Sequence, residues 1–353
     1  MLRVSSSPHV HTSMDIRKSM LFVLIALLPS AIWGVYAFGL RALLVLVVSM
    51  ASAVLVEFLL GRVDHKNTTG DLSALVTGLL VGMNMPPQIP IYIPVIASAF
   101  AIFVVKWTFG GLGCNWMNPA LAGRVFVFFS FSSQMSAFSA PRALAADTLA
   151  SATPLSAVKT AISGGMGGLD YEGVLSQLGY TTTGIAQSIG EALHISPYTV
   201  DAFLGNIGGC IGEVSALLLL AGGIFLIATR VITWHIPVVY LASFSLLSWV
   251  FGGLRASTGL FSGEVLMPLF TGGLMLGAFF MASDWVTTPT TVKGQVIFAL
   301  GCGFFTFLIR YFGSLAEGVS LAIILMNILT PTIERYVKPK KFGYVKPAKE
   351  AKA

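Results

Sequence analysis

The chain has 353 residues, of which 55% are hydrophobic and only 10% charged, and its mean hydropathy of +0.83 excludes an ordinary soluble domain. Several apolar stretches reach the roughly 18 residues that a helix needs to cross about 30 Å of hydrocarbon. The net charge of +6 comes from basic residues in short segments between these stretches and in a tail at 335–353. This distribution indicates positive-inside membrane topology, and we expect no nucleic-acid partner.

Ten apolar segments are predicted to form membrane helices. Two of them, 72–85 and 266–283, are short or interrupted by glycine, so each is predicted to be a half-helix that stops inside the membrane. The sequence therefore predicts an all-α integral membrane protein. The ten segments lie near 19–38, 42–61, 72–85, 91–107, 115–131, 207–228, 235–252, 266–283, 294–312 and 316–334.

Lysine and arginine residues set the predicted orientation. When ten crossings are counted, the basic residues before the first segment and after every even-numbered segment fall on one side. Lys106 belongs to this group, whereas Arg310 belongs to the smaller group on the opposite side. Both termini are therefore predicted to be cytoplasmic, and the long loop at 132–206 to be extracytoplasmic.

Five segments precede the long loop and five follow it, so a five-helix repeat must be inverted. "TGLLVG" at 77–82 is similar to "TGGLMLG" at 271–277, at matching places in the two halves. Inverted repeats with broken helices typically hold a ligand or ion between them, although glycines also allow close helix packing. The predicted parts are a first membrane half at 1–131, the loop at 132–206, a second membrane half at 207–334 and the tail at 335–353.

Four acidic residues near the predicted bilayer are candidates for a role in ion movement: Glu57, Glu213, Asp284 and Glu317. An ionisable group in hydrocarbon costs several kcal/mol unless it is paired or hydrated. The alternative is that the acidic residues at helix ends are solvated by water among the lipid headgroups. Glu213 in "GGCIGEVS" and Glu317 in "GSLAEGVS" are predicted to lie at helix N-termini, where the helix dipole favours a carboxylate.

The stretch "GGLGCNWMNPALAGRVF" at 110–126 contains Asn118 in an Asn-Pro-Ala motif and, within the following helix, Arg124. Asn-Pro-Ala suggests a water channel, in which the asparagine caps a half-helix, but such channels need two copies and the second half has none. Arg124 must be paired inside a membrane, and a phosphate, a carboxylate or backbone carbonyls could each serve.

The sequence offers little support for a metal or nucleotide site made by this chain alone. Cys114, Cys210 and Cys302 are isolated, and the five histidines have no haem-ligand placement. No GxGxxG fingerprint follows a strand, so we expect NAD to bind elsewhere. The first apolar run is too long for a cleavable signal peptide, and none is expected.

Several of these motifs occur in an order that resembles a known family. They are "GGLGCNWMNPALAGRVF", "DTLASATPL", "GNIGGCIGEVSALLLLAGGIFLI", "GAFFMASDWVTTPTTVKGQ" and "IRYFGSLAEGVSLAIILMNILTPTIERYVKPKKFG". Together they resemble the D subunits of the Rnf electron-transport complex, a ferredoxin:NAD oxidoreductase, from about residue 15 to 343. The resemblance to the B subunits of the sodium-translocating NADH:quinone reductase is weaker, because those usually carry a longer N-terminal extension.

The resemblance implies FMN joined through its phosphate to a threonine in a motif approximating Asp-x-x-Ser/Thr-Gly-Ala-Thr. In "DTLASATPLSAV" at 147–158, Asp147 takes the acid position and Thr153 the acceptor position, with Ser151 as the second candidate. Two departures are Ala150, where serine or threonine is common, and Ser151 in place of glycine. A flavin transferase needs an extended, exposed, small-sided target, and Pro154 biases Thr153 away from helix. The alternative is a short helix over "PLSAVKTAIS" capped by Ser151 or Thr153.

The function implied by the resemblance is electron transfer across a membrane coupled to sodium or proton transport. Implied cofactors are covalent FMN on Thr153 and non-covalent riboflavin between the two halves, with Asn118 and Arg124 as further flavin contacts. Implied partners are the other Rnf subunits, especially the extracytoplasmic G subunit that carries FMN, and a flavin transferase during maturation. The implied location is a bacterial or archaeal cytoplasmic membrane. The rival interpretations are a stand-alone channel or transporter for a small solute, and an inert scaffold subunit.

Overall fold

The computed structural model describes residues 14–65, 68–141, 152–163, 171–255, 259–313, 315 and 317–339, apart from the side chains of Ser163 and Arg255. In this part of the chain all regular structure is helical, as predicted. Four helices are long and apolar enough to cross a membrane: α1 (Ile16–Phe38), α2 (Leu40–Val63), α12 (His235–Arg255) and α15 (Val292–Tyr311).

The remaining predicted membrane segments contain shorter or broken helices. α4 (Tyr92–Phe100) continues as a π-helix (Ala101–Trp107), and α14 (Leu274–Leu276) continues as another (Gly277–Met281). The ten predicted segments therefore all contain helix, whereas ten crossings in two inverted repeats stay a prediction. The others are α3 (Ser73–Met83), α5 (Pro119–Ser130), α11 (Ala216–Ala228), α13 (Leu266–Phe270) and α16 (Val319–Tyr336).

The two segments predicted as half-helices do contain short or broken helices, whereas their ends inside the membrane stay a prediction. α3 has 11 residues, which at 1.5 Å per residue is about half the hydrocarbon thickness. The segment at 266–283 is broken between α13 and α14, where Gly272 and Gly273 have φ of +65° and +70°. Because residues with side chains rarely adopt this left-handed conformation, the glycine pair is what ends α13 and allows a new helix to start.

The predicted helix at 207–228 begins later than expected. Residues 205–215 are irregular, and α11 starts only at Ala216, with Ser215 as its cap. The irregular backbone instead binds the end of α3. The Ile211 amide donates to the Met85 carbonyl at 3.1 Å, and the amide of residue 212 donates to the Met83 carbonyl at 2.8 Å. Irregular backbone is tolerated in a membrane protein when it is buried in protein. The expectation that Glu213 opens a helix is therefore wrong, and Glu317 also lies before its helix, α16.

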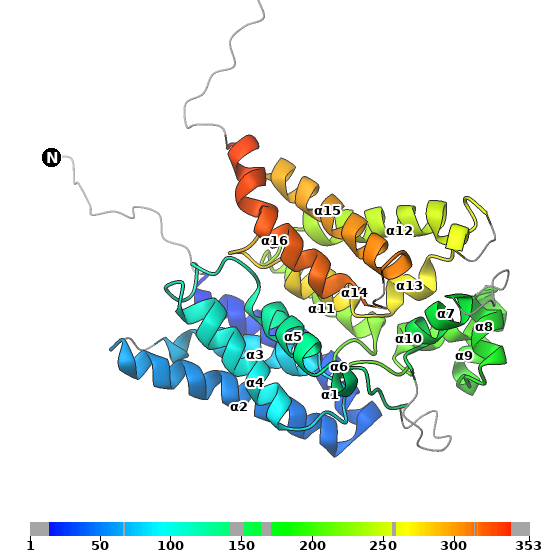
Figure 1. Cartoon of the computed structure of the whole chain (residues 1–353), viewed down its shortest axis with the longest axis horizontal. Helices are drawn as coiled ribbons and strands as arrows, with labels where there is room; N and C mark the ends of the chain where they lie inside the picture. Colours follow the sequence, from blue (N-terminus) through cyan, green and yellow to red (C-terminus); the bar gives the residue numbers. More distant parts are fainter. Residues whose placement is uncertain are drawn as a thin grey trace, which may run out of the picture.

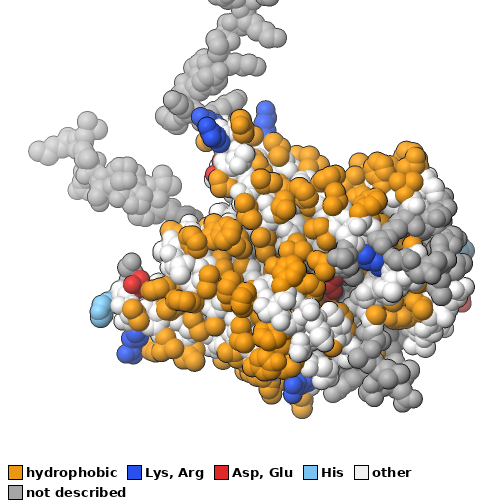
Figure 2. All heavy atoms as spheres, viewed as in Figure 1, with side chains coloured by type: hydrophobic (Ala, Val, Ile, Leu, Met, Phe, Trp, Pro, Cys, Tyr) orange, Lys and Arg blue, Asp and Glu red, His pale blue; other side chains and the backbone are white. Residues whose placement is uncertain are grey.

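The elements are arranged with α1 to α5 on one side and α11 to α16 on the other (Figure 1). We call the end of this bundle at which α1 begins and α16 ends the terminal end, and the opposite end, where α7 to α10 lie, the loop end. Hydrophobic side chains cover most of the face in Figure 2, and the few visible charged ones lie mainly toward its edges. An apolar surface of this kind suits contact with lipid.

The described part of the long loop contains five short helices. One of them, α6 (Ser132–Met135), follows α5 directly; the other four form a separate group that the sequence does not predict, apart from one alternative. They pack around a small apolar core of their own that includes Val158, Val174 and Leu175 and reaches Met267 of α13. The alternative helix over "PLSAVKTAIS" is confirmed as α7. The four helices are α7 (Pro154–Ser163), α8 (Tyr171–Gln177), α9 (Gly184–Leu193) and α10 (Pro197–Leu204). The described part of the loop is thus a packed unit that holds α7 against the membrane bundle.

Candidate functional site

Thr153 lies immediately before α7 and acts as its cap. Its hydroxyl accepts a hydrogen bond from the Ser156 amide (3.3 Å) and donates to Ser156 Oγ (3.0 Å). Thr153 is only 6% exposed, so the expectation of an exposed acceptor is wrong for Thr153. The other two residues predicted from the motif, Asp147 and Ser151, lie outside the described residues.

A small cavity of about 260 Å³ joins Thr153 to the centre of the bundle. Its walls come from three segments that are far apart in the sequence: the start of α7, the irregular backbone before α11, and the break after α13. The lining includes Thr153, Leu155, Gly209, Glu213, Thr271 and Gly272. The predicted flavin acceptor and one predicted ion-pathway carboxylate therefore share one cavity, a proximity that the sequence did not indicate.

Glu213 has one satisfied and one unsatisfied carboxylate oxygen. Its Oε1 accepts from the Cys210 amide at 2.8 Å, while its Oε2 is buried and has no hydrogen-bond partner among the described residues. This second oxygen lies against Gly273, where an added Cβ would come within 2.6 Å of it. A buried carboxylate oxygen without a partner is costly, so Glu213 Oε2 is a candidate ligand for a cation or a proton.

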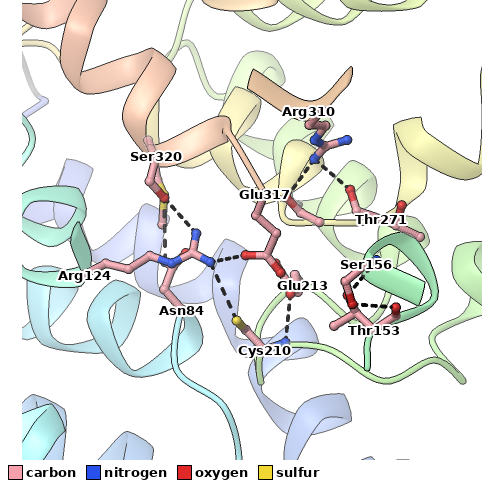
Figure 3. Close-up of polar contacts among 12 residues, drawn as sticks. Asn84, Arg124, Thr153, Ser156, Cys210, Glu213, Thr271, Arg310, Glu317 and Ser320 are labelled. Atoms are coloured by element: carbon pink, nitrogen blue, oxygen red, sulfur yellow. Dashed lines mark hydrogen bonds and ion pairs between the residues drawn. The ribbon is translucent and has the colours of Figure 1, made fainter. Parts of the chain in front are cut away.

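Arg124 provides the positive charge of this region (Figure 3). Its guanidinium pairs with the Glu317 carboxylate and donates to Ser320 Oγ at 2.7 Å and weakly to Cys210 Sγ at 3.8 Å. Of the three possible partners named from the sequence, the carboxylate is the one found here. A contact of Arg124 with a flavin stays a prediction.

Cys210, Glu213 and Glu317 form a cluster whose potential ligand atoms all lie within 4.8 Å of one another. We call these residues together with Arg124 the acid cluster. When both carboxylates are ionised, one guanidinium leaves the acid cluster with one net negative charge. Carboxylate oxygens bind sodium and protons alike, so the acid cluster has the chemistry to hold one monovalent cation or one proton.

Arg310 is a functional candidate that the sequence identifies only as a topology signal. Its buried guanidinium donates to the carbonyls of Pro268 (2.6 Å), Thr271 (3.0 Å) and Gly272 (2.8 Å). These carbonyls belong to the end of α13 and the break that follows it. Arg310 therefore fixes the backbone against which Glu213 lies. The available signal was a guanidinium near the end of a membrane helix, where it must find partners.

A larger cavity, of about 810 Å³ including the part open to solvent, lies between the two halves toward the terminal end. Most of its wall is apolar, with a few polar groups, as is typical of cofactor sites. Asn115 is buried and its Oδ1 has no hydrogen-bond partner among the described residues. The lining includes Ser73, Lys106, Asn115, Asn118, Phe279, Asp284 and Trp285.

Asn118 links the two halves beside this cavity. Its Oδ1 caps α5 by accepting from the amides of Ala120 (3.0 Å) and Leu121 (3.3 Å). Its Nδ2 donates across the interface to the Met281 carbonyl at 3.2 Å. The Asn-Pro-Ala motif thus begins a helix and bridges two segments, and Asn118 also faces the cavity in which riboflavin was predicted.

The other two predicted ion-pathway acids lie apart from the acid cluster. Glu57 is buried and pairs with Lys106, with 2.7 Å between Oε1 and Nζ. Asp284 lines the larger cavity and accepts from the Thr287 hydroxyl at 3.2 Å. The four acids therefore divide into two that come together and two with separate partners, and their roles in ion movement stay predictions.

Comparison with known proteins agrees with the motifs. The sequence profile of the family described as NQR2, RnfD, RnfE matches residues 3–343. The chain belongs to this family. Its helices and its family membership make it a multi-pass membrane protein.

Curated relatives match the chain over nearly their whole length. The chain is 41% identical to the D subunit of the proton-translocating ferredoxin:NAD(+) oxidoreductase complex of Clostridium ljungdahlii, over 96% of each chain. It is 39% identical to the D subunit of the Na(+)-translocating ferredoxin:NAD(+) oxidoreductase complex of Acetobacterium woodii, over 100% of this chain and 98% of the relative. The two names state different ions at nearly equal identity, so similarity alone does not choose between sodium and proton.

Proposed function

We propose that this protein is the flavin-carrying membrane subunit of an ion-translocating ferredoxin:NAD oxidoreductase of the Rnf type. It exchanges electrons with an extracytoplasmic flavoprotein subunit and passes them toward the cytoplasmic side, coupled to sodium or proton movement. The observation that carries the proposal is the position of Thr153, which shares a cavity with Glu213 of the acid cluster. NAD binds another subunit of the complex.

Thr153 is the proposed site of covalent FMN attachment. In the transferase reaction the hydroxyl oxygen attacks the pyrophosphate of FAD, a phosphoester forms, AMP leaves and the hydroxyl proton is lost. Esterification removes the hydrogen bond that the Thr153 hydroxyl donates to Ser156 Oγ. The hydrogen bond that Ser156 Oγ donates to the Thr153 carbonyl, at 2.9 Å, is kept. The phosphate then lies at the N-terminus of α7, where backbone N–H groups and the helix dipole favour an anion. Because Thr153 is buried, attachment requires the first turn of α7 to open.

The larger cavity suits riboflavin better than a phosphorylated flavin. Its wall is mainly apolar, and the unpartnered Oδ1 of Asn115 can accept from the N–H groups of a flavin or its ribityl hydroxyls. Lys106 is already paired with Glu57, and the carboxylate of Asp284 would repel a phosphate. The bound flavin would supply the redox chemistry, while these side chains orient it and exclude water.

The acid cluster is the proposed place where electron transfer meets ion movement. Its net negative charge disfavours further negative charge on the nearby flavin unless a cation enters. A cation held by Glu213 or Glu317 would balance an anionic flavin on Thr153. Each electron that reaches this flavin would then draw one sodium ion or proton to the acid cluster.

Two buried basic residues support the proposed inverted repeat and topology. Lys106 ends the fourth segment and contacts the start of the third at Ser73 Oγ (2.5 Å). Arg310 ends the ninth segment and contacts the broken eighth segment at Thr271 and Gly272. In each half a basic residue near the end of the fourth segment thus contacts the third segment, through side chains toward the terminal end in the first half and through backbone carbonyls toward the loop end in the second. In the proposed orientation the terminal end is cytoplasmic.

The test is ultraviolet fluorescence of the denatured protein band from cells that contain the transferase. Wild type should fluoresce and Thr153→Ala should be dark. Thr183→Ala is the matched control, because Thr183 caps α9 in the same loop by accepting from the Ala186 amide at 3.3 Å, and its band should stay fluorescent. Fluorescence that persists in Thr153→Ala would move the acceptor, first to Ser151. A dark wild-type band would overturn the proposal.

A further inference from the structure

Lys106 lies between two cavities at the terminal end. One is the larger cavity between the halves; the other, of about 460 Å³, is lined by Glu57, Asp64, Thr68 and Gly111 among others. Lys106 contributes to the walls of both. A lysine carries its charge on a flexible four-carbon chain, so rotation about its side-chain bonds can turn the ammonium from one cavity toward the other.

The contacts of the Lys106 ammonium divide in the same way. Nζ donates to Glu57 Oε1 at 2.7 Å on the side of the smaller cavity and to Ser73 Oγ at 2.5 Å on the side of the larger one. Ser73 is the first residue of α3, and its hydroxyl donates in turn to Asp71 at 2.5 Å. A positive charge at a helix N-terminus is unfavourable, so the carboxylates hold the ammonium there against the dipole of α3.

Glu57 has an unused binding capacity. Its Oε2 is buried and has no hydrogen-bond partner among the described residues, while Oε1 is paired with Lys106. Its carboxylate faces the smaller cavity, whose rim includes the exposed Asp64 and Thr68. The smaller cavity therefore lies between the terminal end and Glu57, and a small cation that enters it would approach Glu57 without crossing the larger cavity.

We propose that Lys106 is a movable counter-cation that exchanges with a monovalent cation at Glu57 according to the charge in the larger cavity. With a neutral occupant, the ammonium stays on Glu57. With an anionic occupant, the ammonium turns toward the cavity, and Glu57 takes up one sodium ion or one proton. This inference deepens the proposed function, because it rests on a flavin in the larger cavity.

The charges balance at each step. One electron, delivered by the complex in its proposed reaction, adds one negative charge to the flavin in the cavity. The ammonium of Lys106 neutralises that charge and leaves Glu57 with one uncompensated charge, which one entering cation neutralises. One electron in the cavity thus corresponds to one cation at Glu57. When the electron leaves, Lys106 returns and displaces the cation.

The test is an optical redox titration of the non-covalent flavin in the purified complex at several sodium concentrations, with choline to keep ionic strength constant. One cation bound per electron raises the midpoint potential by 59 mV for each tenfold increase in that cation. If the cation is sodium, the midpoint potential of wild type should show this slope with sodium concentration. If the cation is a proton, the midpoint potential of wild type should fall with pH by 59 mV per pH unit more than that of Lys106→Met does. In Lys106→Met the cation stays on Glu57 in both redox states, so the extra slope should vanish.

Three further variants separate a switch from a merely structural ion pair. Glu57→Gln should also lose the slope, and the double variant Lys106→Met/Glu57→Gln, which leaves no buried charge unpaired, should fold, retain flavin and have no slope. Arg62→Gln removes a positive charge from the same end of α2, outside both cavities, and should keep the wild-type slope.

An unchanged slope in Lys106→Met, or a wild type without a slope for either cation, would overturn the switch. If denatured wild type releases no riboflavin, the flavin assignment of the cavity fails and the switch falls with it.

Discussion

The acid cluster and the Lys106–Glu57 pair place the same kinds of charge in the membrane bundle in two different ways. In the acid cluster one guanidinium serves two carboxylates and is fixed by contacts to Glu317 and Ser320. In the other region one ammonium pairs with one carboxylate, and that pair is neutral. Arginine binds through a rigid planar fork, whereas lysine is a point charge on a flexible chain. This difference supports the two proposals, in which the acid cluster is a fixed cation site and the Lys106–Glu57 pair exchanges a cation.

The largest expected effect is on ion transport by the acid cluster. Glu213→Gln removes the negative charge that the acid cluster offers to a cation but keeps a side chain that can still accept from the Cys210 amide. Ion uptake by the reconstituted complex should be abolished while the gel fluorescence of the covalent flavin is retained. Unchanged uptake would remove Glu213 from the ion pathway and would leave the exchange at Glu57 as the better candidate.

Arg124→Met tests how firmly the acid cluster depends on its one positive charge. The change leaves Glu317 partly buried beside Glu213 without its partner, and breaking a buried ion pair costs about 3–5 kcal/mol. The thermal unfolding midpoint of the detergent-solubilised protein should fall sharply. Arg124→Met/Glu317→Gln removes both charges and should recover most of the loss. A single variant as stable as wild type would show that the pair is not needed for folding.

Gly273→Ala tests the contact between the helix break and Glu213. The left-handed backbone costs about 1–2 kcal/mol for a residue with a side chain, and the new Cβ would lie 2.6 Å from Glu213 Oε2. Gly273→Ala should have a lower unfolding midpoint than wild type. Addition of Gly273→Ala to Glu213→Ala should lower the midpoint by less, because the steric part of the cost is absent and only the backbone part remains. Equal stability of Gly273→Ala and wild type would mean that the break adjusts freely.

The smallest expected effect comes from the cap of α7. Ser156→Ala removes the hydroxyl that binds Thr153 but keeps the backbone amide that Thr153 accepts from. The hydroxyl makes two hydrogen bonds, because it accepts from Thr153 Oγ1 and donates to the Thr153 carbonyl. The cost should be at most about 0.5–1.5 kcal/mol for each of them, and less where water replaces them at this partly buried residue. Hydrogen exchange of α7 should rise slightly, while the fluorescent band should remain. Loss of the flavin in this variant would indicate that Ser156 takes part in attachment.

Much of the fold could be predicted from local sequence. The apolar runs located helix in all ten segments, and the glycine pair at 272 and 273 located the break in the eighth. The start of the sixth segment could not be predicted, because its amides bind carbonyls of α3, more than a hundred residues earlier in the chain. The exposure of Thr153 was predicted wrongly, because the residues that surround it at 207–214 and 271–272 are distant in the sequence.

The candidate site was predicted as a set of residue types without their partners. Scarce acids in an apolar chain and a guanidinium inside a helix pointed to Glu57, Glu213, Glu317 and Arg124, because a charge in hydrocarbon must be compensated. Which charge compensates which could not be read from the sequence. Arg124 and Glu317 are 193 residues apart and Lys106 and Glu57 are 49 apart.

The sequence by itself determined the class of protein, the order of its segments and its family, because these depend on apolar runs and on motifs that are local in the chain. Only the tertiary structure brought Thr153 to Glu213, paired Arg124 with Glu317 and left Lys106 between two cavities. The physical reason is that a buried charge takes whichever partner the packing of distant helices brings within hydrogen-bond distance.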